Sequence, residues 1–195
     1  MAGISNIEIW KPFLVIAGVA ALIFGRFKGR ALVFCLLFSL LIAAQVTSVL
    51  KTMANRHRPK QVQVVRMVEL EKARPEFLTL FKKPRVHYSD ASDRNRSGPS
   101  FPSGHMTNNT VIAVCCTLFF RRWGWLYWIV TAAIGYSRIY LGAHWPSDIL
   151  ATLFLATGET FLILALLEFF WRKFAPKLMP DIYGRHHSLV FNVRS

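Results

Sequence analysis

Hydrophobic positions along this chain form long unbroken runs, and the charged residues lie in the gaps between the runs. A helix needs about 20 predominantly apolar residues to cross the hydrocarbon core of a bilayer. The pattern therefore predicts an all-α fold, a multi-pass transmembrane helical bundle. Five spans are expected, over residues 12–24, 31–50, 105–120, 123–140 and 149–170. The first reaches full length only if residues 7–10 belong to it.

The segment between the second and third predicted spans has a different character, because its apolar residues are scattered among charges. They are Val62, Val64, Val65, Val68, Phe77, Leu78, Leu80 and Phe81, with Pro75 between the two groups. We expect residues 60–100 to form an amphipathic interfacial loop, with one or two short helices lying on the membrane surface. A partly ordered loop is the alternative. Residues 89–99 predict a polar turn region within it.

Composition narrows the class of protein. Hydrophobic residues make up 53% of the 195 residues, which excludes a disordered chain. The length suits one domain over residues 1–195, closed by a polar C-terminal tail over residues 172–195. The net charge is +14, and the basic residues cluster at the ends of apolar runs. That placement favours a bilayer surface and an anionic substrate as partners, rather than nucleic acid.

Neither a metal nor a cofactor is predicted. Cys35, Cys115 and Cys116 all lie inside apolar runs, and the sequence contains no CxxC pair and no His/Cys cluster. The N-terminal region lacks the basic segment and cleavage site of a signal peptide. The first apolar run is therefore expected to stay in the mature protein.

Three polar segments are expected to meet at one face of the bundle. The second span ends where the interfacial loop begins, the third begins where that loop ends, and the fourth ends on the same side. The segments read KTMANRHRP from Lys51, FPSGH from Phe101 and SRIYLGAHWPSD from Ser137. Cations, histidines, a carboxylate and a Ser-Gly pair opening a helix are together suited to phosphoryl transfer without a metal.

Spacing within these segments indicates the chemical role of each group. Pro146 fits the start of a helix, which places Asp148 in the first turn, close enough to reach back to His144. A carboxylate on one ring nitrogen fixes the tautomer and makes the other nitrogen the nucleophile. His105 directly follows the Ser-Gly pair and can protonate the leaving oxygen.

The cations have the complementary task of holding the phosphate. Arg58 and Arg138 each offer a planar fork to phosphate oxygens, while Lys51 supplies a point charge. Backbone N–H groups at Ser103 and Gly104 are placed to hold the same anion.

These segments resemble the three motifs of the type 2 phosphatidic acid phosphatase family, K-x6-R-P, P-S-G-H and S-R-x5-H-x3-D. Every defining position matches, in the family's order, over residues 51–148. The resemblance implies a membrane enzyme that removes phosphate from a lipid through a phosphohistidine intermediate. It implies that His144 is the nucleophile, Asp148 its orienting partner and His105 the general acid. It also implies phosphate binding by Lys51, Arg58, Ser103, Gly104 and Arg138.

Many membrane members of that family have six spans, three of them before the first motif, whereas two are predicted here. Five or six spans are therefore left open. The short turns opposite the site are basic and carry no acids, and bacterial relatives generally face the periplasm. We accordingly expect a bacterial inner-membrane protein with a periplasmic site, although a plain count of basic residues favours the cytoplasm.

The substrate is expected to be a membrane lipid phosphate. Candidates are undecaprenyl pyrophosphate, lipid A 1-phosphate, phosphatidylglycerol phosphate and phosphatidic acid. Two alternatives stay open: a phosphotransferase that passes the phosphate to another lipid, and a non-catalytic protein that binds anionic lipid. The intact pair of His144 and Asp148 argues against the second, because a binder needs no nucleophile.

Polar residues inside the predicted spans favour structural roles. Glu159 lies near the middle of the fifth span, too deep for the phosphate site, and is expected to hydrogen-bond within the bundle. Gln45, Thr47 and Ser48 are expected to bond across helices. His186 and His187 are assigned to the exposed tail.

Overall fold

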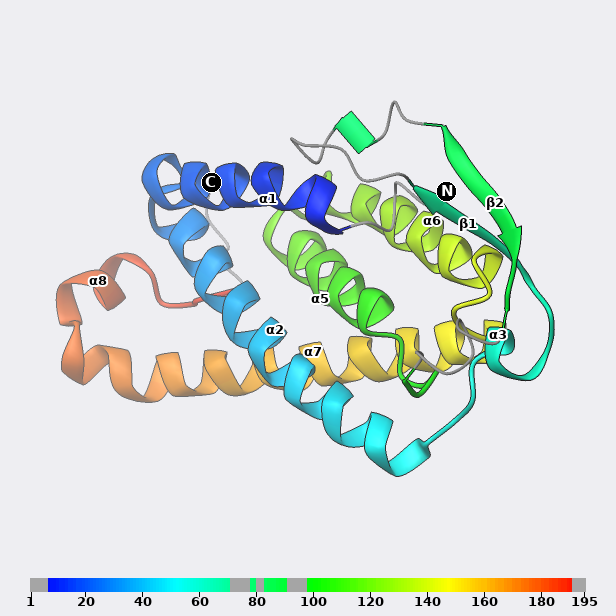
Figure 1. Ribbon diagram of the computed structural model, residues 1–195. Coiled ribbons are helices and arrows are strands. Elements are labelled where there is room, and N and C mark those ends of the chain that lie inside the picture. Colours follow the sequence, from blue (N-terminus) through cyan, green and yellow to red (C-terminus); the bar gives the residue numbers. More distant parts are fainter. Residues whose placement is uncertain (1–6, 71–77, 80–82, 91–97, 191–195) are drawn as a thin grey trace.

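The computed structural model describes residues 7–70, 78–79, 83–90 and 98–190, and most of these are helical (Figure 1). The main helices are α1 (Ile7–Phe24), α2 (Arg26–Ala54), α5 (Gly104–Phe119), α6 (Tyr127–Tyr140) and α7 (Pro146–Leu178). The short helices are α3 (Pro59–Val62), the 3-10 turn η2 (Gly124–Leu126) and α8 (Pro180–Arg185). Two strands, β1 (Arg66–Leu70) and β2 (Pro84–Tyr88), complete the described elements.

Helix α5 forms the centre of the bundle and packs against α2, α6 and α7, while α1 packs along α2. Half of its residues are buried, as expected of a helix that contacts three others. Its buried residues include Met106, Val111, Val114 and Phe119. The predicted cross-helix bonding is confirmed for Thr47, whose hydroxyl lies 3.3 Å from that of Thr107 on α5.

Two helices, those that begin at Arg26 and Pro146, are long and apolar enough to cross a membrane by length and composition. Helices α5 and α6, with 16 and 14 residues, are shorter. Large apolar side chains nevertheless face outward on α1, α2, α6 and α7, among them Ile16, Leu41, Ile129, Phe154 and Leu162. An outward apolar surface of this kind suits a lipid surrounding. The number of spans, five or six, stays a prediction.

The predicted surface helices between α2 and α5 are wrong for the described part of that loop. After the single turn of α3, the chain forms an antiparallel hairpin in which Val68 pairs with Val86. β-branched residues such as valine favour strands over helices, and the helical interpretation of this valine-rich segment did not take that preference into account. The fold is therefore not all-α, because a two-stranded antiparallel hairpin lies between α2 and α5. Phe77, Leu80 and Phe81 lie outside the described residues.

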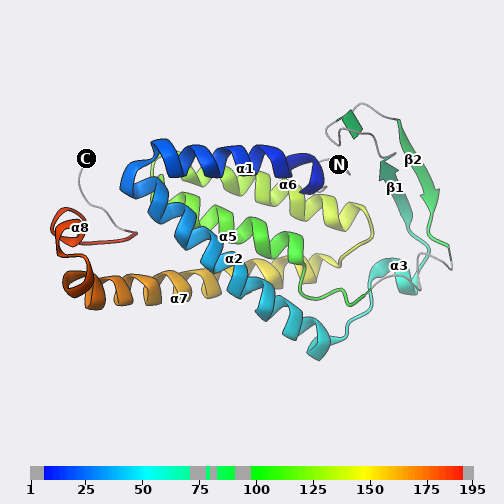
Figure 2. The same cartoon turned by 60° about the vertical axis from the view of Figure 1, so that its left-hand side comes forward.

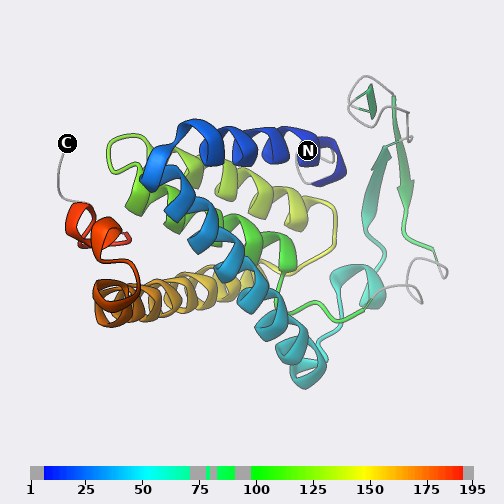
Figure 3. The ribbon, with the colours of Figure 1, turned by 90° about the vertical axis from the view of Figure 1, so that its left-hand side faces the viewer.

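Gly142 fixes the hairpin to the loop between α6 and α7. Its φ of +61° lies in the left-handed region that favours glycine, and a Cβ there would come within 2.6 Å of Val65 Cγ2. The Lys60 backbone N–H also donates to the Gly142 carbonyl over 3.3 Å. The strands themselves project beyond the end of the helices (Figure 3).

The segment from residue 172, predicted to be a polar tail, is largely helical and mostly exposed, but its end packs on the bundle. Helix α7 continues to Leu178, and the chain then folds back so that Leu189 and Val190 are buried beside the start of α2. His186 stacks on Phe27 with ring centroids 4.0 Å apart. Apolar residues near the C-terminus thus complete the core at this end of the bundle.

Glu168 holds the returning segment in place. Its carboxylate is 7% exposed and accepts hydrogen bonds from the backbone N–H groups of Leu189 (2.8 Å) and Val190 (3.1 Å). The Arg172 guanidinium, 2.6 Å away, supplies the counter-charge. Glu159 is predicted to hydrogen-bond within the bundle. One of its two carboxylate oxygens, Oε1, is buried and has no hydrogen-bond partner among the described residues.

We predict that Glu168→Ala releases the C-terminal segment. The substitution leaves two buried N–H groups without acceptors and should lower stability by roughly 3 kcal/mol. The thermal midpoint in detergent should fall, and trypsin should cleave faster after Arg185. Asp181→Ala, at an exposed position of α8, is the matched control and should change neither. Unchanged proteolysis of the Glu168 variant would contradict this role of the carboxylate.

Candidate active site

The C-terminal end of α2, the N-terminal end of α5 and the loop before α7 lie at the same end of the bundle (Figure 2). One hydrogen bond joins two of these elements directly. The Ser103 backbone N–H, at the N-cap of α5, donates to Thr152 Oγ1 in α7 over 3.1 Å. The structure thus brings together the three segments that the sequence analysis singled out.

His144 lies in the loop immediately before α7 and is 2% exposed. Its Nδ1 is 2.6 Å from the backbone carbonyl oxygen of Ser100. A carbonyl oxygen can only accept, so in a neutral ring Nδ1 carries the proton. The lone pair is consequently on Nε2, and the ring is oriented by a backbone group rather than a side chain.

Burial is the main cause that lowers the pKa of His144 from its ordinary 6.5 to about 3, and the positive charges of Arg58 and Arg138 add to it. Lys51 contributes in the same direction, while the contact with Ser100 opposes the shift. The imidazole is therefore neutral at physiological pH. A neutral ring among three cations has a lone pair available in an environment that attracts anions.

Asp148 lies in the first turn of α7, as predicted, but its carboxylate does not contact His144. The carboxylate is fully buried in the first turn of α7, and it accepts hydrogen bonds from the Ser100 hydroxyl and from the Trp145 backbone N–H (3.0 Å). The Arg56 guanidinium pairs with it at 2.6 Å. The expected Asp148–His144 bond is replaced by a connection through Ser100, whose hydroxyl contacts Asp148 and whose carbonyl contacts His144.

Arg58 links separate parts of the chain around the site. Its guanidinium donates to the backbone carbonyls of Gly98 (2.8 Å), Pro99 (3.3 Å) and Ala143 (3.2 Å). A guanidinium has five N–H donors, so donors are left for a ligand. Arg58 therefore holds the loop that precedes α5 against the residue next to His144.

Arg138 is the cation best placed to receive an anion. Its Nε is buried and has no hydrogen-bond partner within the described part of the chain. Leaving such a donor unpaired costs roughly 1–3 kcal/mol, more for a charged group. A phosphate oxygen would satisfy it. The Arg138 carbonyl meanwhile accepts from the His144 backbone N–H over 3.3 Å, which fixes both residues in one turn.

The start of α5 offers open space beside these groups. A Cβ built on Gly104 would meet no atom within 4 Å, so packing within the protein does not require a glycine there. Ser103 is fully buried, and its Oγ accepts from the Met106 backbone N–H at the long distance of 3.5 Å. His105 follows as the second residue of the helix and is partly exposed.

Sequence reasoning missed three residues of this site. Arg56 lies two positions before the motif arginine, Ser100 lies just before the second motif, and Thr152 lies one turn beyond the third. Arg56 is the counter-ion of a buried carboxylate, and Ser100 is the link to His144. Their only signal in the sequence was their position next to motif residues.

Comparison with known proteins supports a common origin of this arrangement. The chain is 39% identical over 64 residues to an undecaprenyl-diphosphatase of Sulfolobus acidocaldarius, covering 32% of this chain and 31% of the relative. It is 30% identical over 95 residues to undecaprenyl-diphosphatase BcrC of Bacillus subtilis, covering 48% and 45%. A lipid A 1-phosphatase of Rhizobium johnstonii is 35% identical over 82 residues, covering 42% and 33%. The matches thus span less than half the length of each relative.

The fold has a solved counterpart. The crystal structure of the transmembrane PAP2 type phosphatidylglycerolphosphate phosphatase from Bacillus subtilis superimposes with a TM-score of 0.56 at 22% identity. The superposition covers 86% of this chain and 75% of that one. The superposition shows a shared fold, and two helices of this chain are long and apolar enough to cross a membrane. Because the family model matches residues 32–173, well over half of its length, the chain belongs to the PAP2 superfamily.

Proposed function

We propose that this protein hydrolyses a phosphate monoester or diphosphate on a membrane lipid, without a metal, through a phosphohistidine on His144. The observation that carries the proposal is a buried, neutral imidazole whose Nε2 bears the lone pair within a group of cations. A structural histidine has no need of three nearby positive charges, whereas a nucleophile toward a phosphate dianion does.

In the first step, Nε2 of His144 attacks phosphorus as the bond from phosphorus to the leaving oxygen breaks. His105, at the start of α5, gives its proton to that oxygen. Arg58, Arg138 and Lys51 offset the charge on the phosphoryl oxygens. The ring of His144 becomes cationic as the N–P bond forms, and the Ser100 carbonyl accepting from Nδ1–H stabilises that charge.

In the second step, a water molecule attacks the phosphohistidine, and His105 takes its proton. The N–P bond breaks, its electron pair returns to Nε2, and inorganic phosphate leaves. His144 is neutral again and His105 is protonated again. The two steps balance without an external co-reactant.

Asp148 acts on His144 through Ser100. The carboxylate holds the Ser100 hydroxyl and thereby fixes the residue whose carbonyl orients the imidazole. Ser100 and Asp148 are in this scheme positioning residues. Arg56 pairs with the carboxylate and holds it in place from the solvent side.

A lipid headgroup with more than one negative charge fits the surroundings best. The three cations that act on His144, namely Lys51, Arg58 and Arg138, can offset more than one negative charge. The relatives named undecaprenyl-diphosphatase and lipid A 1-phosphatase act on lipids of this kind. We therefore rank undecaprenyl pyrophosphate and lipid A 1-phosphate above phosphatidylglycerol phosphate and phosphatidic acid as candidate substrates. The acid-free basic turns opposite the site favour a bacterial inner membrane with the site in the periplasm.

We predict phosphate release from at least one of these four lipids by the purified protein in detergent with EDTA. His144→Ala should lower release by roughly 10³-fold or more, because the nucleophile is lost. His57→Gln removes an exposed histidine close in space and should leave the rate unchanged. No release from any lipid by folded wild-type protein would contradict the proposal. Label appearing on an acceptor lipid instead would favour phosphotransfer.

We predict that Ser100→Ala lowers kcat roughly tenfold and changes KM little, because only the hydroxyl bond to Asp148 is lost. The ¹⁵N chemical shifts of the His144 ring should show less of the Nδ1–H tautomer. Ser39→Ala removes another fully buried hydroxyl, one without a partner in the described residues, and should leave kcat unchanged. Equal kcat in both variants would show that Asp148 does not act through Ser100.

We predict that His144 makes the protein sensitive to acid. The unfolded chain binds a proton at this residue below pH 6.5, whereas the folded protein does so only near pH 3. Stability is therefore lost as pH falls through this window, by roughly 2–3 kcal/mol at pH 4.5. The thermal midpoint should drop less between pH 7 and pH 4.5 in His144→Gln than in wild type or His57→Gln. Equal drops would contradict the burial of a neutral imidazole.

A further inference from the structure

The end of the bundle opposite the candidate active site carries a second group of features. There the α1–α2 turn and the α5–α6 turn lie side by side in all three views (Figures 1–3). Lys28 lies near the start of α2, and its ammonium is 5.9 Å from the centre of the Phe120 ring in the α5–α6 turn. Helix α5, with 16 residues, separates the two ends by about 24 Å at 1.5 Å per residue.

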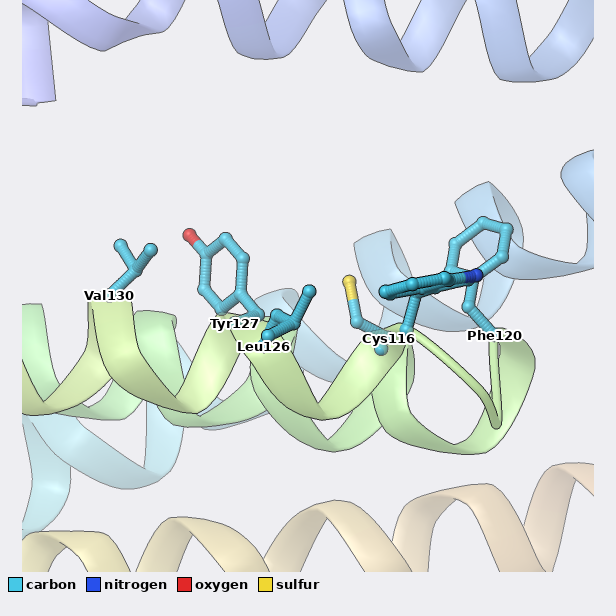
Figure 4. A pocket seen from close by; sticks show the side chains of 7 residues that line it. Cys116, Phe120, Leu126, Tyr127 and Val130 are labelled. Atoms are coloured by element: carbon cyan, nitrogen blue, oxygen red, sulfur yellow. The ribbon is translucent and has the colours of Figure 1, made fainter.

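An apolar groove of about 330 Å³ opens beside the α5–α6 turn. Its lining includes Cys116, Phe120, Trp123, Leu126, Tyr127 and Val130. Figure 4 shows the side chains of Cys116, Phe120, Tyr127 and Val130 projecting on the same side of the helices. The lining is almost wholly apolar, although Phe120 is 47% and Trp123 66% exposed. Such a surface is suited to a hydrocarbon chain.

Exposed cations gather in the two turns at this end of the bundle, and Lys28 and Arg122 are placed beside lining residues of the groove. Residues 25–30 and 116–130 contain Arg26, Lys28, Arg30, Arg121 and Arg122 and no acidic residue. All five cations are exposed. The Arg122 guanidinium lies 5.7 Å from the Trp123 ring, so a cation is held directly at the wall of the groove.

We propose that this groove binds an anionic phospholipid from the leaflet opposite the active site. One acyl chain lies along Phe120, Tyr127 and Val130, and the phosphate is held by Arg121, Arg122 and Lys28. The general preference of basic residues for one face of the membrane accounts for these charges, but it does not account for an apolar groove beside them. An apolar groove with cations beside it at the membrane boundary matches both halves of an anionic lipid.

Native mass spectrometry of the full-length protein in detergent tests the proposal, with phosphatidylglycerol and phosphatidylcholine of identical chains as probes. Wild type should bind phosphatidylglycerol more tightly. The double variant Arg121→Gln/Arg122→Gln should weaken that binding roughly 30-fold, since each basic residue near a membrane surface contributes about fivefold. The matched control, Lys173→Gln/Lys177→Gln, removes two exposed cations from the end of α7 and should bind as wild type does.

Filling the groove provides the second measurement. Val130→Trp places a large ring in the groove and should abolish selective phosphatidylglycerol binding. Ile129→Trp adds the same ring at the neighbouring residue, which is 61% exposed and outside the lining, and should retain it. Equal binding by the two variants would place the lipid elsewhere, including the active site, and overturn the proposal. Equal affinity of the wild type for the two lipids would contradict the proposal that the groove selects an anionic headgroup.

Discussion

The buried carboxylate of Asp148 imposes the constraint on which the rest of the site depends. An ion taken out of water costs several kcal/mol unless other groups satisfy its oxygens. Here the donors come from separate parts of the chain: the Arg56 guanidinium, the Ser100 hydroxyl and the Trp145 backbone N–H. The end of α2, the loop before α5 and the start of α7 are thereby drawn to one point. The carboxylate organises the site before it takes any part in chemistry.

The electrostatics of the site follow from the same arrangement. Burial is the main cause that keeps the imidazole of His144 neutral, and the nearby cations Arg58, Arg138 and Lys51 add to it. Arg58 is itself fixed by three backbone carbonyls, while the buried Nε of Arg138 has no partner in the described residues. The positive charge of these two arginines is thus positioned in advance, and no carboxylate pairs directly with either in the described part of the chain. Such preorganisation favours an anionic ligand without reorganisation when the ligand arrives.

The two ends of the bundle are built for different tasks. At the active-site end, polar loops and a hairpin fixed at Gly142 surround buried charges. At the opposite end, exposed cations flank an apolar groove, and the returning C-terminal segment is held by Glu168. Between them, α5 is packed on nearly all sides and keeps the ends apart. A rigid central helix allows one end to be altered by mutation without displacing the other.

The sequence by itself determined the helical core, the three motif segments and their meeting at one end, because apolar run length and the order of the runs dictate which ends share a side. It also indicated the residue types suited to phosphoryl transfer. It misassigned the valine-rich loop and the C-terminal tail, because strand pairing and burial of Leu189 depend on residues distant in sequence. Only the tertiary structure decided that Ser100, rather than Asp148, contacts His144. That contact uses a backbone carbonyl, a group present at every residue, so no side-chain pattern could have identified it.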